Sequence, residues 1–142
     1  MTEKFLTFYL CDSLLGINVT LIKEINRNIE YTPVPGAQSH IEGLFNMRGQ
    51  VVTLFDLTKL LGIEEKAEQK KLSCIILKVP RDPDQVGFFI DRPGDVIDVN
   101  RDDCELPPAN VGGVEGEYIN SVVKLDKEIL IIIEPGRIFK SR

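Results

Sequence analysis

The chain has 142 residues and a net charge of −5 at pH 7, with 43% apolar and 27% charged residues. Its length fits one domain or two very small ones, and its composition is that of a globular protein. The acidic charge argues against nucleic-acid binding, which depends on clusters of Lys and Arg. The longest apolar run, from Ile129 to Ile133, is far shorter than the ~20 residues of a membrane-spanning helix.

The cysteines and the N-terminal residues favour a cytoplasmic protein. Cys11, Cys74 and Cys104 are an odd number in scattered positions, which excludes a disulfide framework and suggests a reducing compartment. No long apolar stretch follows the charges at the start of the chain, so we expect no secretory signal and no direct insertion into a membrane.

Prolines and glycines divide the chain into short apolar runs that are typical of a mainly β protein. In chain order, the expected strands are Phe5–Leu10, Leu15–Val19, Gly43–Met47, Val51–Phe55, Leu72–Val79, Val86–Asp91, Asp95–Val99, Ile119–Leu125 and Glu128–Ile133.

Turns and loops are expected between these strands. Arg48-Gly49 and Asp126-Lys127 are expected to form tight hairpin turns, the type of the first being open because arginine is a poor residue for positive φ. The proline-rich residues 80–85 predict a hairpin loop, and the charged residues 64–71 a mobile one. One short helix is expected after Asp56, which is a suitable N-cap, and it should end at Gly62.

A weak internal repeat relates the two halves of the chain. A shift of 71 places Gly16–Val19 on Gly87–Ile90 and Glu24-Ile25 on Asp95-Val96. A shift of 78 places Ile41–Gly43 on Ile119–Ser121 and Asp56 on Glu134. We therefore expect one domain over residues 1–142, made of two small barrels over about 1–70 and 71–142 that exchange strands and share a core. The alternative is that two β-rich halves align by chance, because apolar alternation is generic.

Few residues offer catalytic or metal chemistry. His40 is the single histidine and has no second histidine or cysteine pair with metal-site spacing, so a surface hydrogen-bonding role is expected. Asp91, Asp95 and Asp98 are near one another in sequence, but acidic residues beside strands usually face solvent. We expect no catalytic residues, no metal and no cofactor.

Arg48 is the most informative charged residue. It follows a strand directly, and Glu24 is its most suitable counter-charge. In one interpretation a partly buried Arg48–Glu24 pair anchors the turn; in the other Arg48 is exposed and anchors a partner, because arginine is enriched at binding hot spots. The spacing slightly favours the first interpretation.

The ordered set of motifs resembles the CheW-like family of bacterial chemotaxis coupling proteins from about Phe5 to Phe139. The most specific element is Asn46-Met47-Arg48-Gly49, followed by an apolar strand and Asp56-Leu57. The supporting motifs are Phe5–Leu10, Gly16–Val19, Ile22–Ile25, Thr32–Pro35, Ile41–Phe45, Val86–Asp91, Asp95–Ile97, Leu106–Pro108 and Tyr118-Ile119.

The resemblance implies two intertwined five-stranded barrels similar to SH3 domains, and no enzymatic activity. It further implies an adaptor that links the cytoplasmic tips of transmembrane chemoreceptors to the regulatory domain of a histidine kinase. By the same resemblance, the receptor would contact Ile22, Glu24, Gly43, Arg48 and Val96 along the groove between the barrels. The kinase would contact a proline-rich turn with Glu105, Leu106, Pro108 and Asn110.

Three residues depart from the family pattern near these sites. Glu42 stands where lysine is frequent, Glu105 where arginine is common, and Asn110 where an aromatic residue is common. These changes favour a divergent partner at either site. We expect a monomer in isolation, recruited to membrane-bound receptor arrays by its partners. Two other functions stay open: a scaffold for a chemosensory pathway that controls surface motility or gene expression, and a small-ligand binder or enzyme using the cleft between the barrels.

Overall fold

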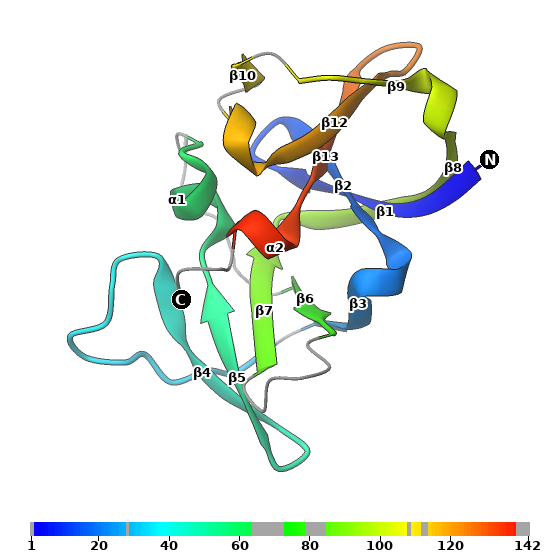
Figure 1. The fold of residues 1–142 in the computed structure, drawn as a ribbon. Helices are drawn as coiled ribbons and strands as arrows, with labels where there is room; N and C mark the ends of the chain where they lie inside the picture. The colour runs from blue at the N-terminus through cyan, green and yellow to red at the C-terminus, as the bar shows by residue number, and fades with distance from the viewer. Residues whose placement is uncertain are drawn as a thin grey trace.

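A computed structural model describes residues 2–27, 29–63, 73–78, 85–107, 109–111 and 114–138 (Figure 1). Most of these residues form strands, and two sheets account for almost all of them. The upper sheet in Figure 1 has six strands in the order β8(Arg92–Asn100), β1(Thr2–Leu10), β2(Ser13–Asn18), β13(Ile129–Ile133), β12(Ile119–Lys124) and β9(Cys104–Glu105).

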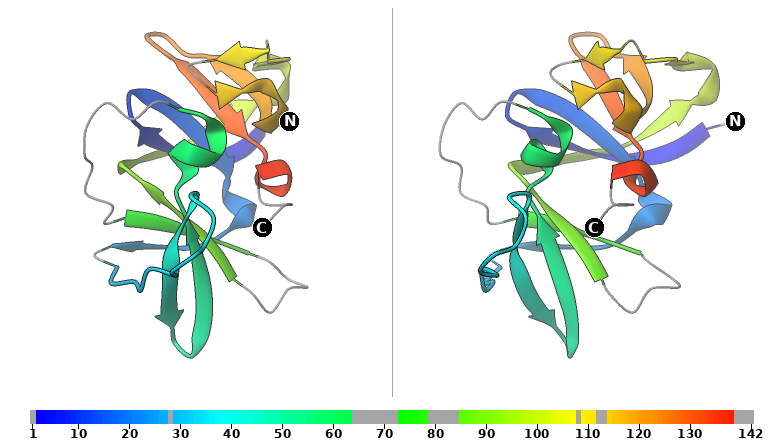
Figure 2. Two further views of the ribbon diagram at one scale, coloured as in Figure 1. Left: turned by 90° about the vertical axis from the view of Figure 1, so that its left-hand side faces the viewer. Right: turned by 60° about the vertical axis from the view of Figure 1, so that its left-hand side comes forward.

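The lower sheet has five strands in the order β3(Ile22–Arg27), β6(Ser73–Leu77), β7(Gln85–Ile90), β5(Gln50–Phe55) and β4(Ile41–Met47). A separate hairpin pairs β10(Asn110–Val111) with β11(Val114–Glu115). The helical elements are α1(Leu57–Leu61), α2(Pro135–Ile138), η1(Val19–Leu21), η2(Arg101–Asp103) and η3(Gly116–Tyr118). The two sheets form two SH3-like barrels, with α1 and α2 at the waist between them (Figure 2). The expected mainly β fold is confirmed.

The barrels exchange strands between the two halves of the chain. In the six-stranded barrel β2 pairs in parallel with β13, and in the five-stranded barrel β5 pairs in parallel with β7. All other strand pairs in the described residues are antiparallel. Each barrel therefore contains strands from both halves of the sequence.

Two backbone features recur at positions 78 residues apart. The β4–β5 ladder has a bulge between Ile41 and Gly43, and the β12–β13 ladder has one between Ile119 and Ser121, which are 78 residues later. The Asp56 amide donates to the His40 carbonyl at 2.8 Å, and the equivalent Glu134 amide donates to the Tyr118 carbonyl at 2.9 Å. The same shift relates Leu57, the first residue of α1, to Pro135, the first residue of α2. The backbone thus has equivalent features at the positions that the shift of 78 relates.

One large apolar cluster, the shared core, fills the space between the barrels. The six-stranded barrel contributes Leu6, Phe8, Leu15, Ile17 and Ile131, and the five-stranded barrel contributes Phe55, Ile75, Phe88 and Ile90. Leu57 and Leu61 from α1 and Ile138 from α2 complete it. Two smaller clusters lie inside the individual barrels, around Leu130 in the six-stranded barrel and around Leu54 in the five-stranded one. The shared core therefore joins the barrels into one folded unit.

The short helix α1 has the ends that its sequence predicts. Asp56 caps it by accepting from the backbone amides of Thr58 and Lys59, and Gly62 ends it at a φ of 79°. Lys59 adds an ion pair to Asp56 at 3.9 Å. The helix covers the shared core with its apolar residues, which fixes the chain between the two halves.

The sequence-based assignment missed several elements and matched others. β3 was not expected as a strand, because Ile22-Lys23-Glu24-Ile25 places two charged residues between two apolar ones and lacks the period-2 alternation of a half-buried strand. The two-residue strands β9, β10 and β11 were also missed, because so few residues carry no periodicity. The nine expected strands are present with small shifts at their ends. The expected loop over residues 64–71 lies outside the described residues, as do residues 80–84 of the expected loop over 80–85.

The surroundings of His40 and Cys74 indicate packing roles for both side chains. The His40 ring stacks on Phe55 at a centroid distance of 5.8 Å. No disulfide joins Cys11, Cys74 and Cys104, and burial raises the pKa of Cys74 to about 12. Cys74 therefore carries its proton at neutral pH and packs as a small apolar side chain.

Candidate functional site

The β4–β5 turn places Arg48 at one end of the five-stranded barrel. Met47 pairs with Gln50, so Arg48 and Gly49 are the two central residues of the hairpin. Their φ angles are 52° and 88°, the positive values that a type I′ turn requires at both positions. The Gly49 amide donates to the Asn46 Oδ1 at 2.9 Å. Arg48 therefore occupies a left-handed conformation that is unfavourable for a residue with a Cβ.

A hydrogen-bonded ion pair holds the Arg48 side chain against β3. Its Nη2 donates to Glu24 Oε2 at 2.6 Å, and Asn26 Nδ2 donates to Glu24 Oε1 at 2.9 Å. These two hydrogen bonds, with the guanidinium charge, lower the pKa of Glu24 below its usual range. The Arg48 side chain is 70% exposed and that of Glu24 is 25% exposed. The predicted pair is confirmed, but its cation is open to solvent and not partly buried.

The Arg48–Glu24 pair connects two strand edges of the five-stranded barrel that no backbone hydrogen bonds join in the described residues. β3 and β4 are the two outer strands of the five-stranded sheet. We call the gap between them the arginine seam; it contains a cavity of about 450 Å³ lined by Glu24, Asn26, Arg27, Ile29, Glu30, Phe45, Asn46, Met47 and Arg48. Lys23 Nζ also reaches Gln50 Oε1 across this gap at 3.2 Å. Side chains thus join two strand edges and leave a hollow beside them.

The stability contribution of the pair should depend on pH. A carboxylate with a lowered pKa stabilises the folded state above its unfolded pKa, ~4.3 for Glu, and this stability is lost as the pH falls through the lower folded pKa. A double-mutant cycle with Arg48→Ala and Glu24→Gln should give a coupling of about 0.5 kcal/mol at pH 7, since the pair is exposed. Urea unfolding at pH 7 and pH 3 measures it. A coupling that is unchanged at pH 3 would contradict the ionic origin.

Ile22 and Val96 lie on different barrels, each at the margin of the shared core. Ile22 pairs with Leu77 and packs against the shared core while staying partly exposed. Val96 pairs with Leu6, a shared-core residue, on the outer strand β8, and is 54% exposed. Leu21 and Ile25 are further exposed apolar residues on η1 and β3. We call these four exposed or partly exposed apolar residues of η1, β3 and β8 the apolar margin.

Gly43 lies beneath the surface, not on it. It is buried in β4, and the segment around Thr32 crosses over it, with Thr32 and Leu44 exchanging two backbone hydrogen bonds of 2.8 and 2.9 Å. A Cβ at this position would overlap the Thr32 carbonyl oxygen and approach the Tyr31 ring at 2.7 Å. Gly43 therefore permits the close approach of two backbones, and it cannot itself present a side chain to a partner.

The proline-rich turn lies on the six-stranded barrel. Glu105 ends β9 and faces Lys124 of β12 with an Nζ–O distance of 3.8 Å. Leu106 is 91% exposed, by far the most exposed large apolar side chain in the described residues. Asn110 begins β10, and the Gly116 amide donates to the Ala109 carbonyl at 2.8 Å. Pro108 lies outside the described residues.

Sequence reasoning missed Asn26, which supports the arginine seam. Its amide nitrogen contacts both Glu24 and the Met47 sulfur, at 2.9 and 3.7 Å. The sequence contains an indication of this contact, because Glu24 and Asn26 are two residues apart and such residues of a strand point to the same face. It was overlooked because β3 was not recognised.

The described residues contain no group of three or more His, Cys, Asp or Glu side chains arranged to hold a metal. Their helices are also too short and polar to cross a membrane. The site consists of an exposed ion pair, an apolar margin and an apolar turn, features of a surface that contacts other proteins.

Comparison with known proteins identifies the family. The CheW-like domain model matches residues 4–142. The chemotaxis protein CheW of Treponema pallidum is 30% identical over 98% of this chain and 83% of its own length, and that of Bacillus subtilis is 32% identical over 96% and 86%. The crystal structure of the scaffolding protein TtCheW from Thermoanaerobacter tengcongensis superimposes with a TM-score of 0.83 and 26% identity, over 94% of this chain and 90% of that one. The family model covers nearly the whole chain, and the protein therefore belongs to the CheW-like family.

Proposed function

We propose that this protein is a chemosensory coupling adaptor that joins the cytoplasmic tips of chemoreceptors to the regulatory domain of a histidine kinase. Membership of the CheW-like family makes it an adaptor of chemotaxis signalling and not an enzyme. The observation that carries the proposal at the level of residues is the exposed Arg48–Glu24 pair, which a turn with positive φ at Arg48 holds in place. Strain of this kind is retained where it serves binding.

The receptor-facing surface is proposed to consist of Ile22, Glu24, Arg48 and Val96. Ile22 and Val96 would supply apolar contact, and Arg48 a charge-assisted hydrogen bond at its edge. Gly43 was included among the contact residues by resemblance; its burial supports a different role, in which it keeps the backbone beneath the surface in place. Effects of Gly43 substitutions on receptor coupling would then be indirect.

Arg48→Ala should reduce the affinity for a receptor tip about tenfold, the loss expected for one hydrogen bond to a charged group. The melting temperature should change by only a few degrees, because an exposed ion pair contributes at most about 1 kcal/mol. Co-sedimentation with receptor-containing membranes and a thermal melt measure the two quantities.

Arg101→Ala is the matched control for this experiment. Arg101 pairs with Glu3 at 2.7 Å, and the two side chains are 69% and 32% exposed, so the pair closely resembles Arg48–Glu24 but lies on the other barrel. Arg101→Ala should leave receptor binding unchanged. Equal losses for both variants, or unfolding of Arg48→Ala, would remove Arg48 from the receptor surface and leave it as a structural anchor.

The kinase-facing surface is proposed to be the turn with Glu105, Leu106, Pro108 and Asn110. The exposed leucine supports this proposal, because its burial against a partner would contribute about 2 kcal/mol to binding. Prolines in the turn restrict the backbone before docking and lower the entropy cost of binding. Glu105, in place of the arginine common in the family, favours a partner with a basic residue opposite it.

We further propose that the protein is a cytoplasmic monomer that joins receptor arrays only with both partners. Only 7% of the residues are aromatic, so few aromatic anchors are available and we expect micromolar affinities, about 8 kcal/mol of binding free energy. Light scattering at tens of micromolar should report a mass near 16.0 kDa. A stable homodimer that buries Arg48 would contradict the proposal and favour a self-assembling scaffold.

A further inference from the structure

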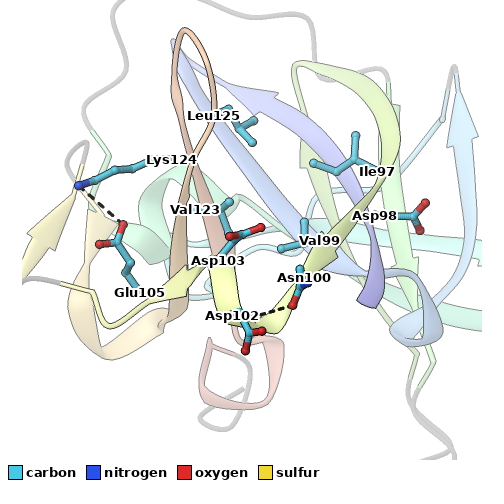
Figure 3. A pocket seen from close by; sticks show the side chains of 10 residues that line it. All are labelled: Ile97, Asp98, Val99, Asn100, Asp102, Asp103, Glu105, Val123, Lys124 and Leu125. Atoms are coloured by element: carbon cyan, nitrogen blue, oxygen red, sulfur yellow. Dashed lines mark hydrogen bonds and ion pairs between the residues drawn. The ribbon is translucent and has the colours of Figure 1, made fainter. Parts of the chain in front are cut away.

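The six-stranded barrel has a seam of its own, and nothing in the described chain bridges it as Arg48 bridges the other. β8 is an outer strand with a ladder neighbour, β1, on one side only, and β9 pairs with β12 only at Val122 and Val123. Between β8 and the end of β12 lies a cavity of about 440 Å³, which we call the acidic seam. Its lining residues are Ile97, Asp98, Val99, Asn100, Asp102, Asp103, Glu105, Val123, Lys124 and Leu125 (Figure 3).

The acidic seam combines an apolar floor with a carboxylate rim. Val99 and Val123 are each 4% exposed and belong to the apolar cluster inside this barrel. Asp103 projects between them, and Glu105 lies on the far wall opposite Lys124 (Figure 3). Asp98 faces Lys4 at 3.3 Å, while the part of the chain that the structure describes brings no cation to Asp102 or Asp103.

The internal repeat relates several residues of the two seams. With the shift of 71, Asn26 and Arg27 correspond to Ile97 and Asp98; with the shift of 78, Phe45 and Asn46 correspond to Val123 and Lys124. The same shifts relate the cation Arg48 to the anion Asp126. The arginine seam thus contains two arginines. At the equivalent positions the second half has Asp98, which lines the acidic seam, and Asp126, which directly follows the lining residue Leu125.

From this correspondence we infer that the acidic seam binds an arginine side chain from an extended basic segment of a partner protein. The apolar floor accepts the aliphatic stem of the side chain, and the rim carboxylates accept hydrogen bonds from the guanidinium. The free edge of β8 offers backbone groups to the segment that carries this arginine. The bound arginine then bridges this seam as Arg48 bridges the other. This inference shares only Glu105 with the proposed kinase turn and does not rest on receptor or kinase coupling.

The test is a titration of ¹⁵N-labelled protein with the peptide acetyl-Arg-Val-Arg-Val-Arg-amide, followed by amide NMR shifts. Alternate residues of a strand face one side, so the three arginines of the extended peptide can face the acidic seam together. The shifts should concentrate on β8, η2 and the end of β12. The same peptide with citrulline in place of arginine keeps the shape without the charge, and it should bind at least tenfold more weakly.

Matched variants distinguish the seam from general charge attraction. Asp98→Asn with Asp103→Asn should weaken binding about fivefold, as expected for two exposed ion pairs. Glu30→Gln with Glu117→Gln removes the same charge from exposed sites elsewhere and should leave the affinity within twofold. Thermal melts check that both double variants fold.

Four results would overturn the inference: dispersed shifts, equal binding of the citrulline peptide, equal weakening by both double variants, or equal affinity for spermidine. The last would show a site for cationic charge in general and not for an arginine on a strand. Because the probe contains neither receptor nor kinase, failure here is distinct from failure of the coupling function.

Discussion

Gly43→Ala is expected to destabilise the protein by about 3 kcal/mol, at the upper end of the cost of overpacking. The added methyl group would overlap the Thr32 carbonyl oxygen, and a backbone atom cannot move aside without disturbing the two hydrogen bonds between Thr32 and Leu44. For a chain of this size the melting temperature should fall by about 10 °C. Calorimetry or urea unfolding measures the loss.

Gly136→Ala is the control for this substitution. Its Cβ would meet only Glu134 Oε1 at 3.6 Å, an ordinary contact, and in the helix α2 alanine should be neutral or stabilising by up to ~1 kcal/mol. Ser121, at the bulge equivalent to Gly43, shows that this bulge itself accepts a side chain. If Gly43→Ala has the melting temperature of the native protein, the segment around Thr32 can move to accommodate the methyl group, and the close approach of the two backbones contributes little to stability.

Leu106→Asp should lower the affinity for the kinase regulatory domain about thirtyfold, the loss typical of a binding hot spot. The leucine is almost fully exposed, so the free protein should lose no stability when it is replaced. Titration of the regulatory domain by calorimetry, beside a thermal melt of each variant, separates binding from folding.

Leu106→Met is the conservative control, because methionine keeps the apolar volume. Its affinity should stay within twofold of the native protein. Unchanged affinity for Leu106→Asp in a folded protein would exclude this turn from the kinase interface.

The fold could be predicted from the sequence to a large extent, because short apolar runs and turn residues specify strands locally. The Asp56 cap and the Gly62 terminus of α1 were recognised from residue type alone, and the shift of 78 matches the bulges at Gly43 and Ser121. β3 was missed because none of its six residues is buried and its apolar residues, Ile22 and Ile25, do not follow the period of a strand. Its strand character depends on pairing with β6, which lies far along the chain.

The candidate site was less predictable, because its geometry depends on tertiary contacts. The Glu24–Arg48 pair could be inferred from charge, but its exposure could not, since that depends on the open edges of β3 and β4. The burial of Gly43 depends on the path of the Thr32 segment across β4. The acidic seam was not foreseen, because its residues come from β8, η2, β9 and β12, and only the folded barrel brings them together.

The exchange of strands between the barrels has a consequence for synthesis of the protein on the ribosome. Leu14 of β2 pairs with Leu130 of β13, more than a hundred residues later. The six-stranded sheet therefore cannot be completed until β13 has left the exit tunnel, and until then β2 exposes an unpaired edge. Loop closure over such distances is slow, and exposed edges of nascent chains favour aggregation. Folding of the six-stranded barrel should therefore follow that of the five-stranded one, whose strands all lie within residues 22–90, and chaperones that shield strand edges would raise the yield.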